Sequence, residues 1–512
     1  MLNEVILKIS DSSELESLLA QISNNFNWVI AGNQDIQEYY YDTFDWRLFN
    51  QNLCLIANNN MLSLSEYNTN SRISSEACKK PKRKYFWNSF RDKLLRDELK
   101  VLLQHRALLK ICKCDKNTEL FRLLNEDDKT IAKLSFEKLT ISNDLNIKFD
   151  SCIIRIQGIR GYSKEFKMIK NIVASAGLKR VDDNYLFFIF SHLGRVPGKY
   201  SSKIKINLDA EMTTAESIRL ILMKLADIII ESEDGIKQDI DIEFLHDYRV
   251  SVRKGRVILS ELKNIIPVHI RKELKEIFAE LGERTNNLRD LDVYLLKKST
   301  YESYLPDVLK KELSPLFDNI RKERLQAFKK LKSFLISEEN KNMILQMECL
   351  LEEDFTFTNS SEGDKPVLHQ SKLAIYKRCK SILKIGRRIK SNSKDEQLHD
   401  LRLECKKLRY LLELFASLFP PKEIDFLVSQ LKMIQDNLGD FNDLSVQQDK
   451  MKMYLDSYLG KSKSEINLAS VIGGLITSLH QRNQVVRNEF LEIFKQFDSK
   501  KNNKIIISLF SS

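Results

Sequence analysis

The hydrophobic positions of the chain follow one pattern in the first 205 residues and another in the rest. In the first part, short apolar segments such as "EVILKIS", "KLSFEKLTI" and "SCIIRIQ" have the length and content of β-strands, with helical stretches between them. From about residue 214 the strand-like segments stop, and apolar residues recur at helical spacing. We therefore predict an α+β domain at 1–205, followed by an all-helical region.

The helical region contains one sequence pattern twice. "FLHDYRVSVRKGRVILSEL" at 244–262 and "LHDLRLECKKLRYLLE" at 398–413 match at a constant offset of 153 residues, which still pairs Val293 with Val446. An offset kept this far indicates an internal repeat. We predict two similar helical bundles, at 214–353 and 370–500, joined by a mobile surface linker at 354–369 that is rich in Ser, Asn, Gly and Asp.

Each copy of the repeat carries a histidine and several basic residues on one face of a helix. At about 100° per residue, four such positions in each copy fall within an arc of about 80° and form a stripe about 15 Å long. Acidic residues of the same helix lie off this face, so they do not neutralise it. The stripes comprise His246, Arg249, Arg253 and Arg256, flanked by Lys254, and His399, Arg402, Lys406 and Arg409, flanked by Lys407.

The chemistry of the stripes suits a chain of phosphate groups better than a metal ion. Arginine offers forked donors to phosphate oxygens, lysine a compact charge, and histidine a further donor. Neither HxxxH nor HExxH occurs at these histidines, and no carboxylate cluster accompanies them. A purely structural role for each histidine remains the alternative.

Three aspartates and two further arginines are additional candidates, and of the aspartates Asp290 recurs as Asp443. Asp290, Asp292 and Asp443 have the chemistry of metal ligands or general bases, but we predict that they cap helices and orient arginines of the stripes. Arg324 and Arg487 occupy similar places near the ends of the two copies. We predict that both of these arginines are exposed to solvent.

Composition narrows the setting in which the protein works. The chain has 512 residues and a net charge of +11, which indicates several domains and an anionic partner. Its eight cysteines form no CxxC pair, as expected for free thiols in a reducing cytoplasm. The first residues lack the features of a signal peptide, and no apolar run is long enough to span a bilayer. We predict a cytoplasmic protein without a membrane partner.

The two basic helices resemble those of the CHAD domain family. The family pattern H-x-x-R-x-x-x-[RK]-[RK]-x-R reads here as "HDYRVSVRKGR" and "HDLRLECKKLR", and "LRDLDV" and "LQDNLGDFNDLSV" follow where the family has similar segments. The resemblance covers about 214–500 and implies two pseudo-symmetric helical bundles around a basic channel that binds inorganic polyphosphate. The ligand contacts that it implies are His246, Arg249, Arg253, Lys254, Arg256, His399, Arg402, Lys406, Lys407 and Arg409, to which we add Arg289 beside Asp290.

The first 205 residues resemble a CYTH domain, a triphosphate-tunnel β-barrel that often precedes a CHAD domain. "YYDTFDWRLFNQNLCL" (40–55) resembles the family's tyrosine-aspartate-threonine segment, and "EVILK" lies where its ExExK signature belongs. Hydrolysis in such a tunnel requires carboxylates for a divalent cation and basic residues around the phosphates. We predict that this domain lacks its catalytic centre, because the positions expected to carry acids or arginines hold Ile6, Ile56, Asn58, Cys152 and Ile154.

These observations predict a non-catalytic polyphosphate-binding protein without a cofactor, with polyphosphate granules as one place where it could act. The alternative is a metal-dependent triphosphatase or polyphosphatase, which would require a divalent cation in the first domain. A third function is nucleic-acid binding through the same basic surface. The stripes argue against it, because they lack interleaved aromatic residues for stacking on bases.

Overall fold

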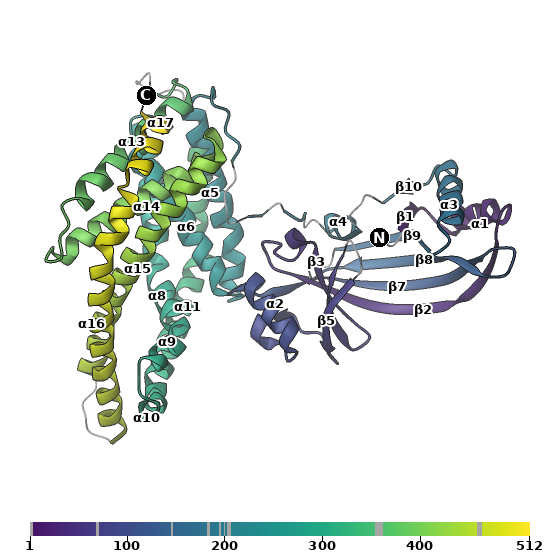
Figure 1. The fold of residues 1–512 in the computed structure, drawn as a ribbon, viewed down its shortest axis with the longest axis horizontal. Coiled ribbons are helices and arrows are strands. Elements are labelled where there is room, and N and C mark those ends of the chain that lie inside the picture. Colours follow the sequence, from purple (N-terminus) through teal and green to yellow (C-terminus); the bar gives the residue numbers. More distant parts are fainter. Residues whose placement is uncertain are drawn as a thin grey trace. The chain divides into compact units, whose positions relative to one another are not determined.

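The chain divides into two compact units, Met1–Ser202 and Lys203–Ser512 (Figure 1). A computed structural model describes residues 4–67, 71–144, 147–181, 185–193, 196–198, 200–201, 206–353, 362–457 and 463–511. Among these residues, no helix combines the length and the apolar content needed to cross a bilayer.

Unit 1 is an α+β domain built on an antiparallel sheet, as predicted. In the described part of the chain the strand order is β10-β1-β9-β8-β7-β2-β3-β4-β5, with β6 paired to β7. The strands are β1 (Glu4–Ile9), β2 (Asn27–Asp42), β3 (Leu53–Asn58), β4 (Met61–Glu66), β5 (Ser71–Ala77), β6 (Lys84–Tyr85), β7 (Leu108–Leu124), β8 (Thr130–Ser142), β9 (Lys148–Gly158) and β10 (Lys179–Arg180). The helices are α1 (Ser12–Ser23), α2 (Lys93–Leu103), α3 (Ser163–Ser175) and α4 (Tyr185–Ser191), with short 3-10 turns at Phe49–Gln51 and Trp87–Ser89.

The two faces of this sheet are covered by different elements. Successive side chains of a strand point to opposite faces, so on β9 Ile154 packs with α1 and α3, whereas Ile153 packs with Tyr40 and Leu186 on the other face. Helices α1 and α3 lie together over the first face (Figure 1). The short apolar helix α4 covers part of the second face, and other residues of that face line a cavity described below.

Unit 2 is helical, as predicted. Its described helices are α5 (Thr214–Lys237), α6 (Ile242–Glu261), α7 (Val268–Arg284), α8 (Asn286–Leu296), α9 (Lys298–Ser303), α10 (Asp307–Lys310), α11 (Ser314–Ile336), α12 (Glu338–Glu352), α13 (Val367–Gly386), α14 (Asp395–Leu414), α15 (Pro421–Ser457), α16 (Lys463–Phe497) and α17 (Lys500–Phe510), with 3-10 turns at Lys311–Leu313 and Ala416–Leu418. The long helices α15 and α16 run alongside each other (Figure 1).

The two copies of the repeat fold similarly but not identically. The basic helices are α6 and α14, which contact α8 and α15 respectively. In the first copy the helix is interrupted at Thr285, between α7 and α8. In the second copy α15 continues as one helix through the equivalent residue, Leu438. Thr285 is buried and its hydroxyl donates to the Leu281 carbonyl, which provides a local reason for the break.

The predicted linker at 354–369 lies only partly within the described structure. Residues 354–361 fall outside the described residues. The helix α13 begins at Val367, so the last three residues of the predicted linker are helical. Just before it, Thr213 and Pro366 form an isolated antiparallel bridge that joins the starts of α5 and α13.

Two helical glycines provide a test of how tightly unit 2 is packed. A Cβ added at Gly386 of α13 would overlap the buried ring of Phe494, whereas a Cβ at Gly473 of α16 would meet nothing within 4 Å. We expect Gly386→Ala to lower the free energy of unfolding by about 1–3 kcal/mol through overpacking. The control Gly473→Ala should raise it by about 0.5–1 kcal/mol because alanine favours the helix. Denaturant unfolding followed by circular dichroism measures both changes, and equal effects would contradict this packing.

Candidate functional site

The two basic helices α6 and α14 contact each other, although they come from different repeats. Lys254 of α6 forms an ion pair with Glu413 of α14, with 2.9 Å between Nζ and Oε2. Arg378 of α13 joins both helices as well, because its guanidinium pairs with Glu261 of α6 and with Glu404 of α14. These bridges hold the two basic stripes side by side.

The stripes meet at Arg253, whose charge acts on cations of both repeats. Desolvation, followed by the charge of Arg253, lowers the pKa of Arg249 to about 10. In the other repeat, desolvation and then the charges of Arg402 and Arg253 lower the pKa of Lys406 to about 7. A depressed pKa means that the cationic form is disfavoured where it stands. An anion placed among these side chains would relieve that cost.

Two repeat-related aspartates lie at the same place. Asp443 of α15 has its carboxylate 3.9 Å from Arg402 and 3.3 Å from Lys297. Desolvation raises the pKa of Asp290 against the lowering effect of Arg249, and the charge of Asp443 raises it further. Asp290 and Asp443 are therefore outnumbered by the basic residues around them, and the net charge of this group of side chains is positive.

The histidines of the stripes are held by equivalent residues in the two repeats. His246 Nδ1 lies 3.0 Å from a guanidinium nitrogen of Arg289, and His399 Nδ1 lies 2.9 Å from the amide oxygen of Asn442, where Asn442 is the repeat partner of Arg289. Because a guanidinium only donates, His246 Nδ1 accepts in its contact, whereas His399 Nδ1 donates to the amide oxygen. The two repeats thus hold their histidines in the same place with opposite hydrogen-bond polarity.

The structure groups some of the eleven predicted site residues and separates others. The electrostatic neighbours of Arg253 and Lys406 form what we call the cationic cluster: Arg249, Arg253, Arg289, Arg402, Lys406 and Arg409. Outside it, Lys254 is buried against Glu413, Lys407 pairs with Glu404, and Arg256 is exposed on α6. His246 and His399 adjoin the cluster through α8 and α15, respectively.

The prediction that Arg324 and Arg487 are exposed is wrong. Arg324 of α11 pairs with Asp239 at 2.6 Å and with Asp292 at 2.8 Å, and its side chain is 18% exposed. Arg487 of α16 pairs with Asp395, and its side chain is 12% exposed. In both repeats, an arginine therefore reaches the start of the basic helix. The prediction that Asp290, Asp292 and Asp443 cap helices is wrong, because the first two lie within α8 and the third lies within α15. Asp292 orients Arg324, which lies outside the stripes.

Unit 1 contains a cavity of about 560 Å³ on the sheet face opposite α1 and α3. Ile6 and Ile56 line it, as the resemblance predicts for their positions. Cys152 and Ile154 do not, because they pack with the α1 and α3 face; the β9 residues that line the cavity are Arg155 and Gln157. The expected register on β9 was therefore wrong by one residue, which reverses the direction of every side chain.

Besides Glu4 of the "EVILK" segment, the cavity holds ionisable residues that the sequence did not single out. Lys116 forms an ion pair with Glu38 at 2.6 Å, and Arg155 pairs with Glu137 at 2.9 Å and with Glu4 at 3.3 Å. The signal that could have found them is the alternation of side chains along β2, β7, β8 and β9. Without the pairing of the strands, however, several acidic and basic residues fit that alternation equally well.

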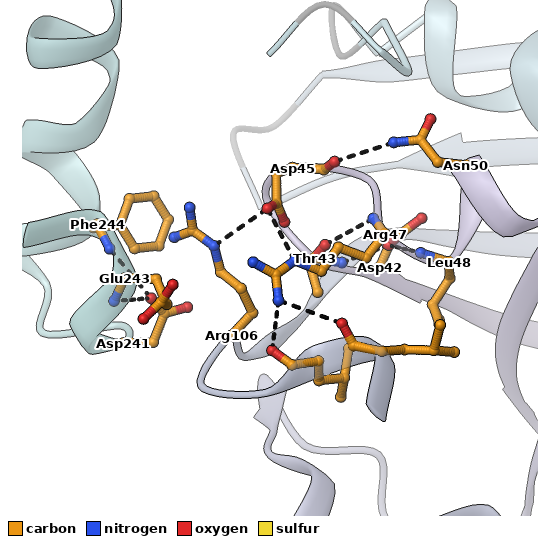
Figure 2. A network of polar contacts seen from close by, with 12 residues as sticks. Asp42, Thr43, Asp45, Arg47, Leu48, Asn50, Arg106, Asp241, Glu243 and Phe244 are labelled. Carbon is orange, nitrogen blue, oxygen red and sulfur yellow. Dashed lines mark hydrogen bonds and ion pairs between the residues drawn. The ribbon is translucent and has the colours of Figure 1, made fainter. Parts of the chain in front are cut away.

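The segment at 40–55 forms a tightly bonded turn, and Tyr40 and Cys54 at its ends line the cavity. The buried Asp42 carboxylate accepts hydrogen bonds from the backbone N–H groups of Thr43, Leu48 and Phe49. Figure 2 shows Asp45 beside Arg47 and Arg106, with carboxylate-to-guanidinium distances of 3.0 and 3.6 Å. Arg47 also donates to the carbonyl of Leu103 at the end of α2. These contacts give the segment a structural role in this chain.

Comparison with known proteins identifies the helical unit. Residues 220–452 match the family model of the CHAD domain, so this chain contains a CHAD domain. Three solved structures are similar: the CHAD domain from the plant Ricinus communis (21% identity, 57% of this chain, 95% of that chain, TM-score 0.49), PptA from Streptomyces chartreusis (12%, 56%, 100%, 0.45), and the putative adenylyl cyclase HpAC1 from Hippeastrum, described as revealing a dominant triphosphatase activity (12%, 39%, 100%, 0.23). No curated protein matches the chain significantly.

Proposed function

We propose that the CHAD domain binds inorganic polyphosphate at the cationic cluster without hydrolysing it. The observation that carries this proposal is the position of Arg253 among cations of both repeats. Desolvation and mutual repulsion lower the pKa of several of these groups, so the site is electrostatically unsatisfied without an anion. Guanidinium groups also match phosphate oxygens with two parallel hydrogen bonds.

A chain of phosphates suits this site better than a single one. Each stripe extends about 15 Å along its helix, which exceeds the reach of one phosphate group. A ligand bound to one repeat is already close to the cations of the other, so a long chain gains affinity by effective concentration. The affinity should therefore rise with chain length.

A titration of the purified protein with long-chain polyphosphate tests this proposal, with orthophosphate and tripolyphosphate as controls. We expect long-chain polyphosphate to bind most tightly and its affinity to fall steeply with salt, because phosphate contacts release counterions. A single-stranded oligonucleotide at matched salt distinguishes a general polyanion site. Equal affinity for both polymers would indicate a general polyanion site, and tighter binding of the oligonucleotide would favour the nucleic-acid alternative.

The alternative function, a metal-dependent triphosphatase in unit 1, predicts a different result. We expect no phosphate release from tripolyphosphate with Mg²⁺ or Mn²⁺, because Glu38, Glu137 and Glu4 are already paired with Lys116 and Arg155. Metal ions would have to break these pairs before the carboxylates could bind them. Metal-dependent release that is lost in Glu137→Gln and retained in Lys406→Glu would establish the alternative.

We also propose that binding takes place in the cytoplasm, where polyphosphate granules could recruit the protein. The eight cysteines are all free thiols, which suits a reducing compartment. A fluorescent fusion should colocalise with stained granules. An Arg253→Glu fusion expressed at the same level should remain diffuse, and granule association of that variant would separate localisation from the cationic cluster.

A further inference from the structure

The two stripe histidines have surroundings that the repeat makes nearly equivalent. The charged residues one turn away on the same helix, and on the facing helix, correspond in pairs: Glu243 and Glu396, Arg249 and Arg402, Asp290 and Asp443. The residue in contact with the histidine differs, however. It is Arg289 for His246 and Asn442 for His399. The chain therefore places one histidine beside a cation and its repeat equivalent beside a neutral amide.

Arg289 fixes the hydrogen-bond role of His246. Its guanidinium nitrogens lie 3.0 Å from His246 Nδ1 and 3.3 Å from the carbonyl oxygen of Ile242. Because a guanidinium only donates, Nδ1 keeps this bond only while it is unprotonated, and the ring proton then lies on Nε2. A second proton would have to go to Nδ1, where it would break the bond and face a cation. This contact therefore disfavours the charged form of His246.

Asn442 permits His399 to become a cation. His399 Nδ1 lies 2.9 Å from the amide oxygen of Asn442. That oxygen accepts a hydrogen bond from Nδ1–H in the neutral ring and in the imidazolium alike, so a proton added at Nε2 costs no hydrogen bond. His399 is also exposed, so its charged form stays hydrated. In this arrangement Nε2 is an acceptor in the neutral ring and becomes a donor only when it binds a proton.

The other charged groups near His399 do not oppose a positive charge on its ring. They come from its own helix and from α15 and α16: Asp395, Glu396, Arg402, Asp443 and Arg487. Arg487 pairs with Asp395, and the Arg402 guanidinium lies 3.9 Å from the Asp443 carboxylate. Both arginines of this group are therefore accompanied by a carboxylate. His246 has no such balance at its contact, because Arg289 itself is the contacting group.

We propose that Arg289 and Asn442 are positioning residues that make the two repeats bind polyphosphate differently. His399 contacts a phosphate oxygen as an imidazolium, whereas His246 stays neutral. The interior oxygens of a polyphosphate chain only accept hydrogen bonds, so the bare Nε2 of neutral His399 repels them. Protonated Nε2 instead donates a charge-assisted hydrogen bond. The proton comes from solvent, so binding at the second repeat takes up a proton. This inference rests on the proposed function and deepens it.

Heteronuclear NMR of the histidine side chains in the full-length protein tests the positioning without any ligand. The chain has seven histidines, and His246→Gln and His399→Gln assign the two signals. Between about pH 8 and 5.5, where imidazole side chains usually change charge, we expect His399 to pass from the Nδ1–H form to the imidazolium. His246 should keep the Nε2–H form over this range. If both rings take up protons at the same pH, the proposal is wrong.

Exchanging the two positioning residues should exchange the behaviour of the histidines. Asn442→Arg gives His399 the neighbour that His246 has, and its ring should then stay neutral over the same range. Arg289→Asn should let His246 take up a proton. The matched control is Asn442→Asp, because a carboxylate of the same shape still accepts from Nδ1–H; His399 should then become charged at a higher pH than in the natural protein. A ring that still becomes charged in Asn442→Arg would overturn the proposal.

A titration with long-chain polyphosphate tests the effect on binding, in a Lys406→Arg background whose charge does not change with pH. Here we expect the affinity to rise about threefold from pH 8 to pH 5.5. Adding His399→Gln or Asn442→Arg should remove this rise, and adding His246→Gln should preserve it.

The outcomes separate this inference from the proposed function. If the rise disappears with His246→Gln or persists with Asn442→Arg, this inference alone is overturned. If the natural protein does not bind polyphosphate at any pH in this range, the proposed function and this inference are both overturned.

Discussion

Replacing Arg253 by glutamate is expected to weaken the binding of long-chain polyphosphate by about a hundredfold or more at low salt. The change removes the one guanidinium that lies close to basic residues of both repeats. It places a carboxylate among Arg249, Arg402 and Lys406 instead. That carboxylate would pair with the neighbouring cations and compete with phosphate for them. Fluorescence or calorimetric titration over a range of salt concentrations measures the effect, and the salt dependence should become less steep.

Two variants serve as controls for this effect. Lys329→Glu makes the same kind of change at an exposed position of α11 and should cost only a small factor. Arg256→Glu changes a residue of the same stripe that is exposed on α6, and it should cost much less than Arg253→Glu. If all three variants weaken binding equally, the cationic cluster is not the site and only net charge matters.

The affinity for polyphosphate should rise about tenfold as the pH falls from about 8 to 6. The free protein has Lys406 with a pKa of about 7, because desolvation and the charges of Arg402 and Arg253 disfavour its cation. A bound phosphate favours the cation and raises this pKa. Binding above neutral pH is therefore accompanied by uptake of a proton on Lys406. The affinity stops rising once the pH is low enough for Lys406 to be charged in the free protein.

The Lys406→Arg variant isolates this effect, because arginine keeps the charge at every pH in the range. The affinity of this variant for polyphosphate should depend less on pH than that of the natural protein. The difference between the two affinities should be largest near pH 8, where the natural lysine is mostly neutral. If the affinity of this variant still depends on pH, adding His246→Gln and His399→Gln tests whether the two histidines cause the remaining dependence. Calorimetry in buffers of different ionisation enthalpy measures the proton uptake directly, and no uptake at pH 8 would contradict the role of Lys406.

The sequence alone determined the architecture of the helical unit and the nature of its surface. Helical periodicity and a repeat offset are local properties, visible without knowing which segments pack together. They yielded the two basic helices, the equivalence of His246 with His399, and the resemblance to the CHAD family that the comparison of residues 220–452 confirms. The α+β character of the first domain followed from the same kind of local pattern.

Only the tertiary structure decided which charged residues meet. Arg253 lies next to Arg402 and Lys406, and Lys254 pairs with Glu413, because two helices more than a hundred residues apart in sequence pack together. On β9, a shift of one residue exchanged the cavity-facing and the buried side chains, and a strand's alternation alone does not fix which set faces which way. Partners of this kind are set by long-range packing, which single-sequence periodicity does not encode.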